Sequence, residues 1–477
     1  MKYLIGIDGG TQSTKVGIYD TNGNLVCEEK TALKPLYVPD ADTAEHPDDD
    51  LWDSLVYVCR NLMNKFEGNK EDIIGIGLGS IRCCRAYLKK DGTLAYPVIN
   101  WMDKRLAKPY QNDVEDMAYL TTTTGYLTCR LTGEFKDTAA NYEGAYGPFD
   151  KVNWKWSDNP EDYKEWNITR ENLFDLVMPG DVLGYVTEEA SEKTLLPKGC
   201  PVIATANDKA AEGLGAGIKN DGSVLVSLGT YIGGMMRGTE YTESSVDYWA
   251  NLSAIPHEYL YETSVGIRRG MWSVSWFKEL LGEELAEKAA SLGKSVEELL
   301  EAEAKTVAAG SEGLLTVGEF LAPNNMPWRK AMFIGFDGRH KRAHMYRSIL
   351  ESIAMTMQMS VYAMCDEMKM KPSRVIVSGG GSNSPLFMQI FADVFGIPSS
   401  RNVVNNAAGL GAAINAAVGV GVYPDYETAI DNMVGIRDTF EPNLENTKVY
   451  NDIIENVYRN IKDYSDPVNK KIYDLFG

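Results

Sequence analysis

The chain opens with the stretch Tyr3-Leu4-Ile5-Gly6-Ile7-Asp8-Gly9-Gly10-Thr11-Gln12-Ser13-Thr14-Lys15, in which an apolar run breaks into glycines and hydroxyls. The pattern predicts a buried strand, a tight glycine turn and a second strand, and backbone N–H groups in such a turn can approach an anion without obstruction. Asp8 stands at the strand end, where its carboxylate can hold Mg2+ through water beside phosphates. Lys15 adds a cation. The stretch therefore indicates a phosphate-binding turn with a metal site.

An ordinary β-hairpin explains part of the same pattern. Val16 and Ile18 alternate toward a core, and Asn22-Gly23 is a strong two-residue turn. The local pattern alone does not separate the two interpretations, so the rest of the chain must do so.

Length and charge limit the classes of function. A chain of 477 residues is long enough for two domains with a cleft between them. Its 67 acidic and 47 basic residues give a formal charge of −20, which opposes binding to nucleic acid and to anionic membranes. The sequence lacks an apolar run of about 18 residues and leads directly into a predicted strand, so we expect a cytoplasmic protein without a membrane segment.

The cysteines and histidines give little sign of a metal cluster. The seven cysteines form no C-x-x-C pair, and their odd number argues against a disulfide framework. Of the four histidines, only His340 and His344 share helical spacing, and we expect that pair on a solvated helix face. The lack of a disulfide pattern among the cysteines therefore predicts a reducing compartment.

Turn residues divide the chain in two. A strand over residues 201–204 leads into an alanine- and glycine-rich helix that ends at Gly217, and a turn follows at residues 219–222. We place the domain boundary there, so that residues 1–218 form an N-terminal domain and residues 219–477 form a C-terminal domain. The first domain is then expected to carry the phosphate-binding turn of the opening stretch.

Residues 224–234 repeat the order of the opening stretch, with a strand, glycine and hydroxyl residues and a second strand. This order predicts an internal duplication whose two turns clamp one nucleotide from both sides. Farther on, a strand over residues 374–377 runs into Gly379-Gly380-Gly381 and a helix with Ser384 as its N-cap. A last amphipathic helix is expected over residues 450–461.

Asp208 follows the strand at residues 201–204 and has two interpretations. It can be the carboxylate that phosphoryl transfer to an alcohol requires, or it can cap the helix that begins there. The sequence has no Walker lysine motif and no complete G-x-G-x-x-G fingerprint. Asp8, Thr230 and the triple-glycine loop are instead typical of the actin-like type of ATP site.

These motifs resemble the FGGY family of carbohydrate kinases, in order and over nearly the full length of the chain. The stretch Gly335-Phe336-Asp337-Gly338-Arg339-His340, followed by residues 342–351, is similar to the second signature of the family. Xylulokinases and glycerol kinases have the nearest patterns. The resemblance implies an α/β fold of two actin-like (ribonuclease H-like) ATPase domains facing an interdomain cleft.

The resemblance also implies site residues. Asp208 would be the general base and Asp8 would organise Mg2+ beside ATP, while a small sugar or polyol would be the partner and a homodimer is left open. Nucleotide contacts are implied at Gly10, Thr11, Gln12, Ser13, Thr14, Lys15, Gly229, Thr230, Gly379, Gly380, Gly381 and Asn383. Sugar contacts are implied at Arg82, Cys83, Trp101, Asp103 and Asp208.

Three departures from the family pattern concern the substrate. Arg82 stands where xylulokinases have histidine and resembles the polyol-binding arginine of glycerol kinases, and Lys209 follows Asp208 where glutamine is common. The segment between Arg105 and Tyr126 is much shorter than in typical members. A pentulose such as xylulose is the expected substrate, and the two cations raise the alternative of a sugar acid or polyol, such as gluconate or glycerol, unless Lys209 points to solvent.

A fold alone does not determine an activity. Two other classes of protein with the same fold must therefore be considered. A non-catalytic sugar or nucleotide sensor would be expected to lack Asp8 or Asp208. An actin-like ATPase of the chaperone kind would carry an extra substrate domain, which the sequence lacks. We therefore expect an ATP-dependent sugar kinase.

Overall fold

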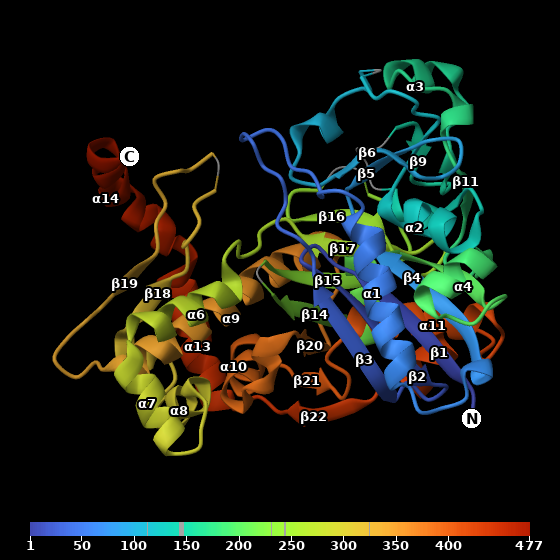
Figure 1. The fold of residues 1–477 in the computed structure, drawn as a ribbon. Helices are drawn as coiled ribbons and strands as arrows, with labels where there is room; N and C mark the ends of the chain where they lie inside the picture. The colour runs from blue at the N-terminus through green and yellow to red at the C-terminus, as the bar shows by residue number, and fades with distance from the viewer. Residues whose placement is uncertain (112, 143–146, 230, 243–244, 324) are drawn as a thin grey trace.

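Two lobes, each built around one β-sheet, make up the protein (Figure 1). The computed structural model describes residues 1–111, 113–142, 147–229, 231–242, 245–323 and 325–477. Within these residues, none of the helices combines the length and apolar character needed to cross a bilayer.

The first sheet has six strands, with the opening strand near its middle. Their order across the sheet is β12 (Val182–Tyr185), β13 (Pro201–Asn207), β4 (Ile73–Ser80), β1 (Tyr3–Gly9), β2 (Ser13–Asp20) and β3 (Leu25–Ala32). Strands β1, β2 and β3 pair antiparallel, whereas β1, β4 and β13 run parallel. The carboxyl ends of β1, β4 and β13 therefore meet at one edge of the sheet.

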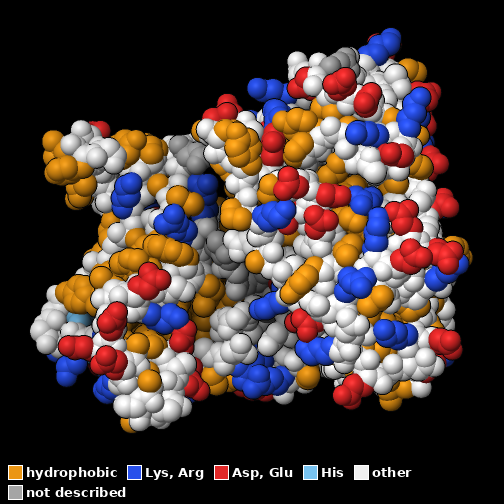
Figure 2. All heavy atoms as spheres, in the orientation of Figure 1, with side chains coloured by type: hydrophobic (Ala, Val, Ile, Leu, Met, Phe, Trp, Pro, Cys, Tyr) orange, Lys and Arg blue, Asp and Glu red, His pale blue; other side chains and the backbone are white. Residues whose placement is uncertain are grey.

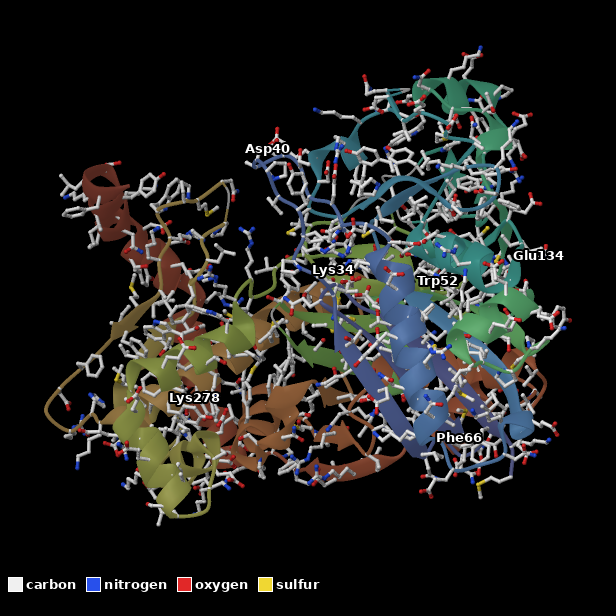
Figure 3. All side chains as sticks on the ribbon, in the orientation of Figure 1. Lys34, Asp40, Trp52, Phe66, Glu134 and Lys278 are labelled. Atoms are coloured by element: carbon white, nitrogen blue, oxygen red, sulfur yellow. The ribbon has the colours of Figure 1, made fainter. Side chains whose placement is uncertain are left out.

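One face of this sheet is covered by α1 (Asp50–Lys65), α2 (Thr123–Thr132) and α4 (Glu188–Thr194). Trp52 lies on α1 and Phe66 lies just beyond its end (Figure 3), and both side chains are buried in this core. Phe66 packs edge-on against Tyr3 of β1, with ring centroids 5.0 Å apart.

A smaller sheet and an excursion lie beside the first lobe. The strands of the small sheet are β5 (Arg85–Leu88), β6 (Leu94–Ile99) and β7 (Tyr119–Thr121). The excursion contains β8 (Lys136–Thr138), β9 (Phe149–Asp150), β10 (Lys155–Trp156), α3 (Pro160–Glu165) and β11 (Asp175–Val177). Between the small sheet and the excursion lies a separate aromatic core that includes Tyr87, Tyr110, Tyr142 and Trp156.

The second sheet repeats the central arrangement of the first. Its order is β16 (Tyr248–Leu252), β17 (Tyr259–Thr263), β15 (Ile232–Gly238), β14 (Ser223–Leu228), β20 (Arg374–Ser378), β21 (Ser399–Asn402) and β22 (Ile436–Phe440). As with β1, β14 pairs antiparallel with the next strand and parallel with a strand that comes much later in the chain. This correspondence is what the predicted duplication requires.

The remaining elements surround the second sheet. They are α6 (Gly270–Leu280), α7 (Glu283–Ser291), α8 (Val296–Ala304), β18 (Leu315–Val317), β19 (Met332–Ile334), α9 (Arg342–Met368), α10 (Pro385–Phe395), α12 (Tyr426–Met433), α13 (Leu444–Asn456) and α14 (Ile461–Phe476). The prediction of one closing helix over residues 450–461 is wrong, because the backbone leaves helical geometry at Val457 and α14 continues away from the lobe (Figure 1).

Two glycine-rich helices lie between the sheets. Helix α5 (Asp208–Ala216) follows β13, and α11 (Ala407–Gly419) packs on both α5 and the first sheet although it follows the second sheet in sequence. A Cβ atom built on Gly77 of β4 would lie 1.8 Å from the carbonyl oxygen of Ala412 in α11. Only glycine permits this approach of helix and strand, so the two lobes are joined through closely packed backbones.

Candidate active site

Asp8 and Asp208 lie at neighbouring strand ends. Asp8 is the second-to-last residue of β1, and Asp208 directly follows β13. Strand β4 lies between these two strands in the sheet. Asp8 is only 6% exposed. Burial raises the pKa of Asp8 to about 6, Lys15 counteracts this increase, and the charge of Asp208 adds to it. The fold therefore brings the two predicted carboxylates into one electrostatic environment.

Asn207, and not Asp208, caps helix α5. The Asn207 side chain accepts a hydrogen bond from the backbone N–H of Ala210 at 2.9 Å, which is the N-cap geometry. Asp208 is the first residue of the helix, and its carboxylate accepts the N–H of Lys209 at 3.0 Å. The capping interpretation of Asp208 is wrong, because the residue before it fills that role. Burial raises the pKa of Asp208, and the charges of Arg82 and Lys209 counteract this increase.

The first glycine turn is tight and places Lys15 beside Asp8. Gly10 donates its N–H to the carbonyl of Ser13 at 3.0 Å, and the Lys15 ammonium lies 3.4 Å from an Asp8 carboxylate oxygen. Thr14 points inward instead, since its hydroxyl is 2.8 Å from that of Ser54 on α1 and its side chain is buried. Thr11 and Ser13 are half-buried, and Gln12 is exposed.

The second glycine turn follows β14 in the other lobe. Gly229 accepts the backbone N–H of Met271 at 3.2 Å, which anchors the turn to α6. Thr230 lies outside the described residues.

The triple-glycine loop exposes bare backbone at the end of β20. Gly379 has φ of +85°, and a Cβ atom there would lie 2.4 Å from the carbonyl oxygen of Leu228. A Cβ on Gly380 would meet no atom within 4 Å, so this backbone faces open space. Gly381 is buried, Asn383 is exposed, and Ser384 caps α10 as predicted. A flat ligand can therefore approach the loop at Gly380.

Arg82 joins the two lobes. It follows β4 and donates two hydrogen bonds to the carboxylate of Glu262 on β17, at 2.5 and 3.0 Å. Asn251 donates to the same carboxylate at 2.5 Å. Burial alone would raise the pKa of Glu262, but the charge of Arg82 holds it below its usual value. Neither Glu262 nor Asn251 lies in a sequence motif, so sequence reasoning missed both residues.

Lys209 faces the space between the lobes. Its ammonium is 2.8 Å from a carboxylate oxygen of Glu212 and 3.2 Å from the Ser227 hydroxyl of β14. Glu212 also accepts hydrogen bonds from Ser227 at 2.7 Å and from Ser378 of β20 at 2.5 Å. The alternative that Lys209 points to solvent is wrong. Glu212 lies four residues after Asp208, so helical spacing was the signal that could have placed it at the site.

The predicted sugar residues outside the strand ends lie in different environments. Trp101 is 49% exposed, and Cys83 adopts φ of +56° beside Arg82. Asp103 is buried, and its carboxylate accepts hydrogen bonds from the backbone N–H of Ala44 at 2.8 Å and from the guanidinium of Arg105 at 2.7 Å. Asp103 thus holds two chain segments together.

The surface is recessed between the lobe that carries α1 and the lobe that carries α6 to α8 (Figure 2). Both aspartates and the two glycine turns sit at strand ends, and the hydrogen bonds of Arg82 and Glu212 cross from one lobe to the other. Such an arrangement can hold an anion between two backbone turns and keep a buried carboxylate next to it.

Comparison with known proteins agrees with this geometry. The models of the N-terminal and C-terminal domains of the FGGY family of carbohydrate kinases match residues 3–118 and 224–420. The uncharacterized sugar kinase YgcE of Escherichia coli (strain K12) is 53% identical over 92% of this chain and 89% of its own length. The xylulose kinase of Lactococcus lactis subsp. lactis (strain IL1403) is 28% identical over 93% of each chain.

The fold is shared with solved structures. A ligand-bound xylulose kinase from Lactobacillus acidophilus superposes with a TM-score of 0.84 at 19% identity, covering 99% of this chain and 100% of that one. The expected α/β fold of two actin-like (ribonuclease H-like) domains is thereby confirmed, as is the expected activity class of an ATP-dependent sugar kinase. The chain belongs to the FGGY family of carbohydrate kinases.

Proposed function

We propose that this kinase transfers the γ-phosphate of ATP to a hydroxyl of a small neutral sugar, a pentulose such as xylulose, with Asp208 as the general base. The observation that carries the proposal is the position of Asp208, which is half-buried, acts electrostatically on Asp8 and is freed from helix capping by Asn207. The relation to the Lactococcus xylulose kinase supports a pentulose as the first candidate.

Asp208 has the chemistry that the transfer needs. Its carboxylate accepts the proton of the sugar hydroxyl while the hydroxyl oxygen forms a bond to the γ-phosphorus and the bond from that phosphorus to the bridging oxygen of ADP breaks. Burial raises the pKa of Asp208, which makes this carboxylate a better proton acceptor than an exposed one. The interlobe position excludes water from the hydroxyl once the lobes close.

The acidic groups around Asp8 suit a divalent cation. Burial raises the pKa of Asp8 and of Asp208, and the charge of Glu212 adds to both increases, whereas Lys209 holds the pKa of Glu212 itself below its usual value. Bound Mg2+ supplies charge neutralisation at the phosphates, and a single buried carboxylate with water ligands is a usual protein contribution to such a site. We assign this role to Asp8.

The glycine turns are assigned to the nucleotide. The turn at Gly10 and the turn at Gly229 come from equivalent places in the two sheets, and Gly380 presents exposed backbone for the adenosine. We keep the division into residues 1–218 and 219–477 as part of this proposal, with closure of the two lobes around ATP and sugar.

A neutral substrate is favoured over a sugar acid because both cations near the site already have carboxylate partners. Arg82 pairs with Glu262, and Lys209 pairs with Glu212. A carboxylate substrate would have to displace one of these partners and leave it buried and unpaired, which costs free energy. Gluconate is therefore the weaker alternative, and glycerol remains a neutral one.

A coupled assay of ADP formation tests the proposal. We expect ATP consumption to be stimulated most by a ketopentose among xylulose, ribulose, glycerol and gluconate, as judged by kcat/KM. A clear preference for gluconate would refute the neutral substrate but not the kinase. The assignment of Asp208 is tested separately by Asp208→Asn, which is expected to lower kcat about 10²–10⁴-fold. Retained turnover in that variant would refute the base role.

A further inference from the structure

A pocket lies against the small sheet of the first lobe. It has a volume of about 210 Å³ and is bounded by side chains of β5 and β6 and of the segment that follows Asp103. Its walls include Arg85, Tyr87, Tyr96, Arg105, Lys108 and Tyr110. None of its described lining residues belongs to the aspartate pair or to the glycine turns. The pocket is therefore distinct from the proposed site of phosphoryl transfer.

Arg85 is the unusual residue of this pocket. Its side chain is 2% exposed, yet among the described residues no carboxylate forms an ion pair with it. The guanidinium donates to the Leu106 carbonyl at 3.1 Å and weakly to the Tyr87 hydroxyl at 3.4 Å, and its Nε has no hydrogen-bond partner. Arginine stays protonated in proteins, so this is a buried positive charge with one unsatisfied donor, the Nε–H group. Such a charge is costly unless an anion compensates it.

Arg105 lies in the same pocket, but its positive charge is neutralised by carboxylates of the protein. Its guanidinium lies 2.6 Å from Glu45 and 2.7 Å from Asp103, so its charge is balanced within the protein and its position is fixed. Lys108 adds an exposed ammonium at the rim, and Asp113, which is also exposed, is the one acidic residue among the described walls. Among the residues that the structure describes, the buried end of the pocket at Arg85 has no carboxylate paired with the guanidinium.

The tyrosines give the pocket rigid walls and hydroxyl groups. The ring of Tyr87 packs against that of Tyr110, with centroids 5.4 Å apart, and edge-on against Tyr96, with centroids 6.3 Å apart. The Tyr96 hydroxyl is itself held by Glu45 at 2.7 Å. These walls are fixed before any ligand enters, which lowers the entropic cost of binding.

We infer that the pocket is a binding site for a small organic anion whose phosphate or carboxylate group pairs with Arg85. The planar guanidinium offers two parallel N–H donors to either group. The volume fits a small metabolite rather than a nucleotide or a peptide. The segment that follows Arg105 contributes Lys108, Pro109 and Tyr110 to the wall of this pocket.

Titration calorimetry on the full-length protein tests this inference, with inorganic phosphate and malonate as separate probes and sodium chloride at matched ionic strength as reference. We expect one of the two anions to bind, and the arm that binds identifies the anionic group. Arg85→Gln is expected to weaken that binding at least about tenfold, because a hydrogen bond to a charged group contributes about 1.5 kcal/mol or more. Its kinase activity without added anion reports that the variant is folded.

Lys15→Gln is the matched control, because phosphate could instead bind at the nucleotide turn. This variant is expected to bind the anion as the wild type does. If Arg85→Gln fails to fold, the exposed Lys108→Gln replaces it, with an expected loss of about threefold. The inference is overturned if neither anion binds the wild type beyond the chloride reference, or if binding is lost in Lys15→Gln and kept in the Arg85 or Lys108 variant.

Discussion

Arg82 and Glu262 form a two-bond ion pair that joins the lobes, with hydrogen bonds of 2.5 and 3.0 Å between guanidinium and carboxylate. The charge of Arg82 also acts on Asp208. Burial raises the pKa of Asp208, and Arg82 limits this increase. One interaction therefore contributes both to the contact between the lobes and to the electrostatic environment of the proposed base.

A double-mutant cycle over Arg82→Gln and Glu262→Gln measures this connection. Both single variants remove the same two hydrogen bonds, and Arg82→Gln also leaves the buried carboxylate of Glu262 without the guanidinium, so the two losses in unfolding free energy should not add. We expect a coupling of about 1–3 kcal/mol from urea denaturation. Losses that add within about 0.5 kcal/mol would show that the pair is not coupled.

Asp208 and its neighbour Asn207 should separate activity from stability. Asn207→Ala removes the cap of α5 and is expected to cost about 1 kcal/mol of unfolding free energy. Asp208→Asn is expected to abolish most sugar phosphorylation without lowering the melting temperature, because the buried carboxylate is already disfavoured in its charged form. Thermal unfolding and kcat measured on both variants check this contrast. A large drop in melting temperature for Asp208→Asn would mean that the carboxylate is structural.

Glu212→Gln should change substrate preference. The substitution removes the carboxylate that neutralises Lys209 but keeps an oxygen that can accept from Ser227 or Ser378. The ratio of kcat/KM for gluconate to that for xylulose is expected to rise about tenfold, since a hydrogen bond to a charged group contributes about 1.5 kcal/mol. Glu212→Asp, which keeps the charge, is the control. An unchanged ratio in Glu212→Gln would show that Lys209 does not contact the sugar.

His46 should make the protein less stable in mild acid. Its ring is buried and within 3.0 Å of the Asn100 amide, and burial lowers its pKa from 6.5 to about 4. The unfolded chain therefore binds a proton between these values when the folded chain does not, and stability falls as the pH drops through this window. From pH 7.5 to pH 5 this residue is expected to cost about 2 kcal/mol.

The measurement is the difference in unfolding free energy between pH 7.5 and pH 5 for the wild type and for His46→Gln. The variant should lose about 2 kcal/mol less over this range, because glutamine does not titrate. Equal pH dependence of the two proteins would show that His46 is protonated in the folded state.

Gly77→Ala should destabilise the contact between the first sheet and α11. The added methyl group would lie 1.8 Å from the Ala412 carbonyl oxygen, and backbone must move to admit it. We expect a loss of about 1–3 kcal/mol in urea denaturation. Gly338→Ala is the control, since nothing lies within 4 Å of its built Cβ atom and its change should stay within about 0.5 kcal/mol.

Short-range sequence patterns predict the elements whose formation depends on residues close to one another in the chain. The strand ending at Asp8, the helix starting after Asn207 and the cap at Ser384 depend on neighbours a few residues away, and all three are present. The apolar spacing predicts one continuous closing helix, whereas the structure has a break at Val457 between α13 and α14 that this spacing does not reveal. Asp208 was given two roles because a strand-to-helix junction suits both.

The amino-acid sequence alone is enough to indicate strand ends with aspartates, turns rich in glycine, and a kinase of the FGGY type, since each of these features resides in contiguous residues. The tertiary structure determines which charged groups pair. Arg82 and Glu262 are 180 positions apart in the sequence, and Lys209 contacts Ser227 only because the two sheets face each other. The three-dimensional structure also buries Arg85 with its Nε unpaired among the described residues. Coulombic and hydrogen-bond energies depend on distance in space and on exclusion of water, neither of which is encoded in the spacing of residues along a chain.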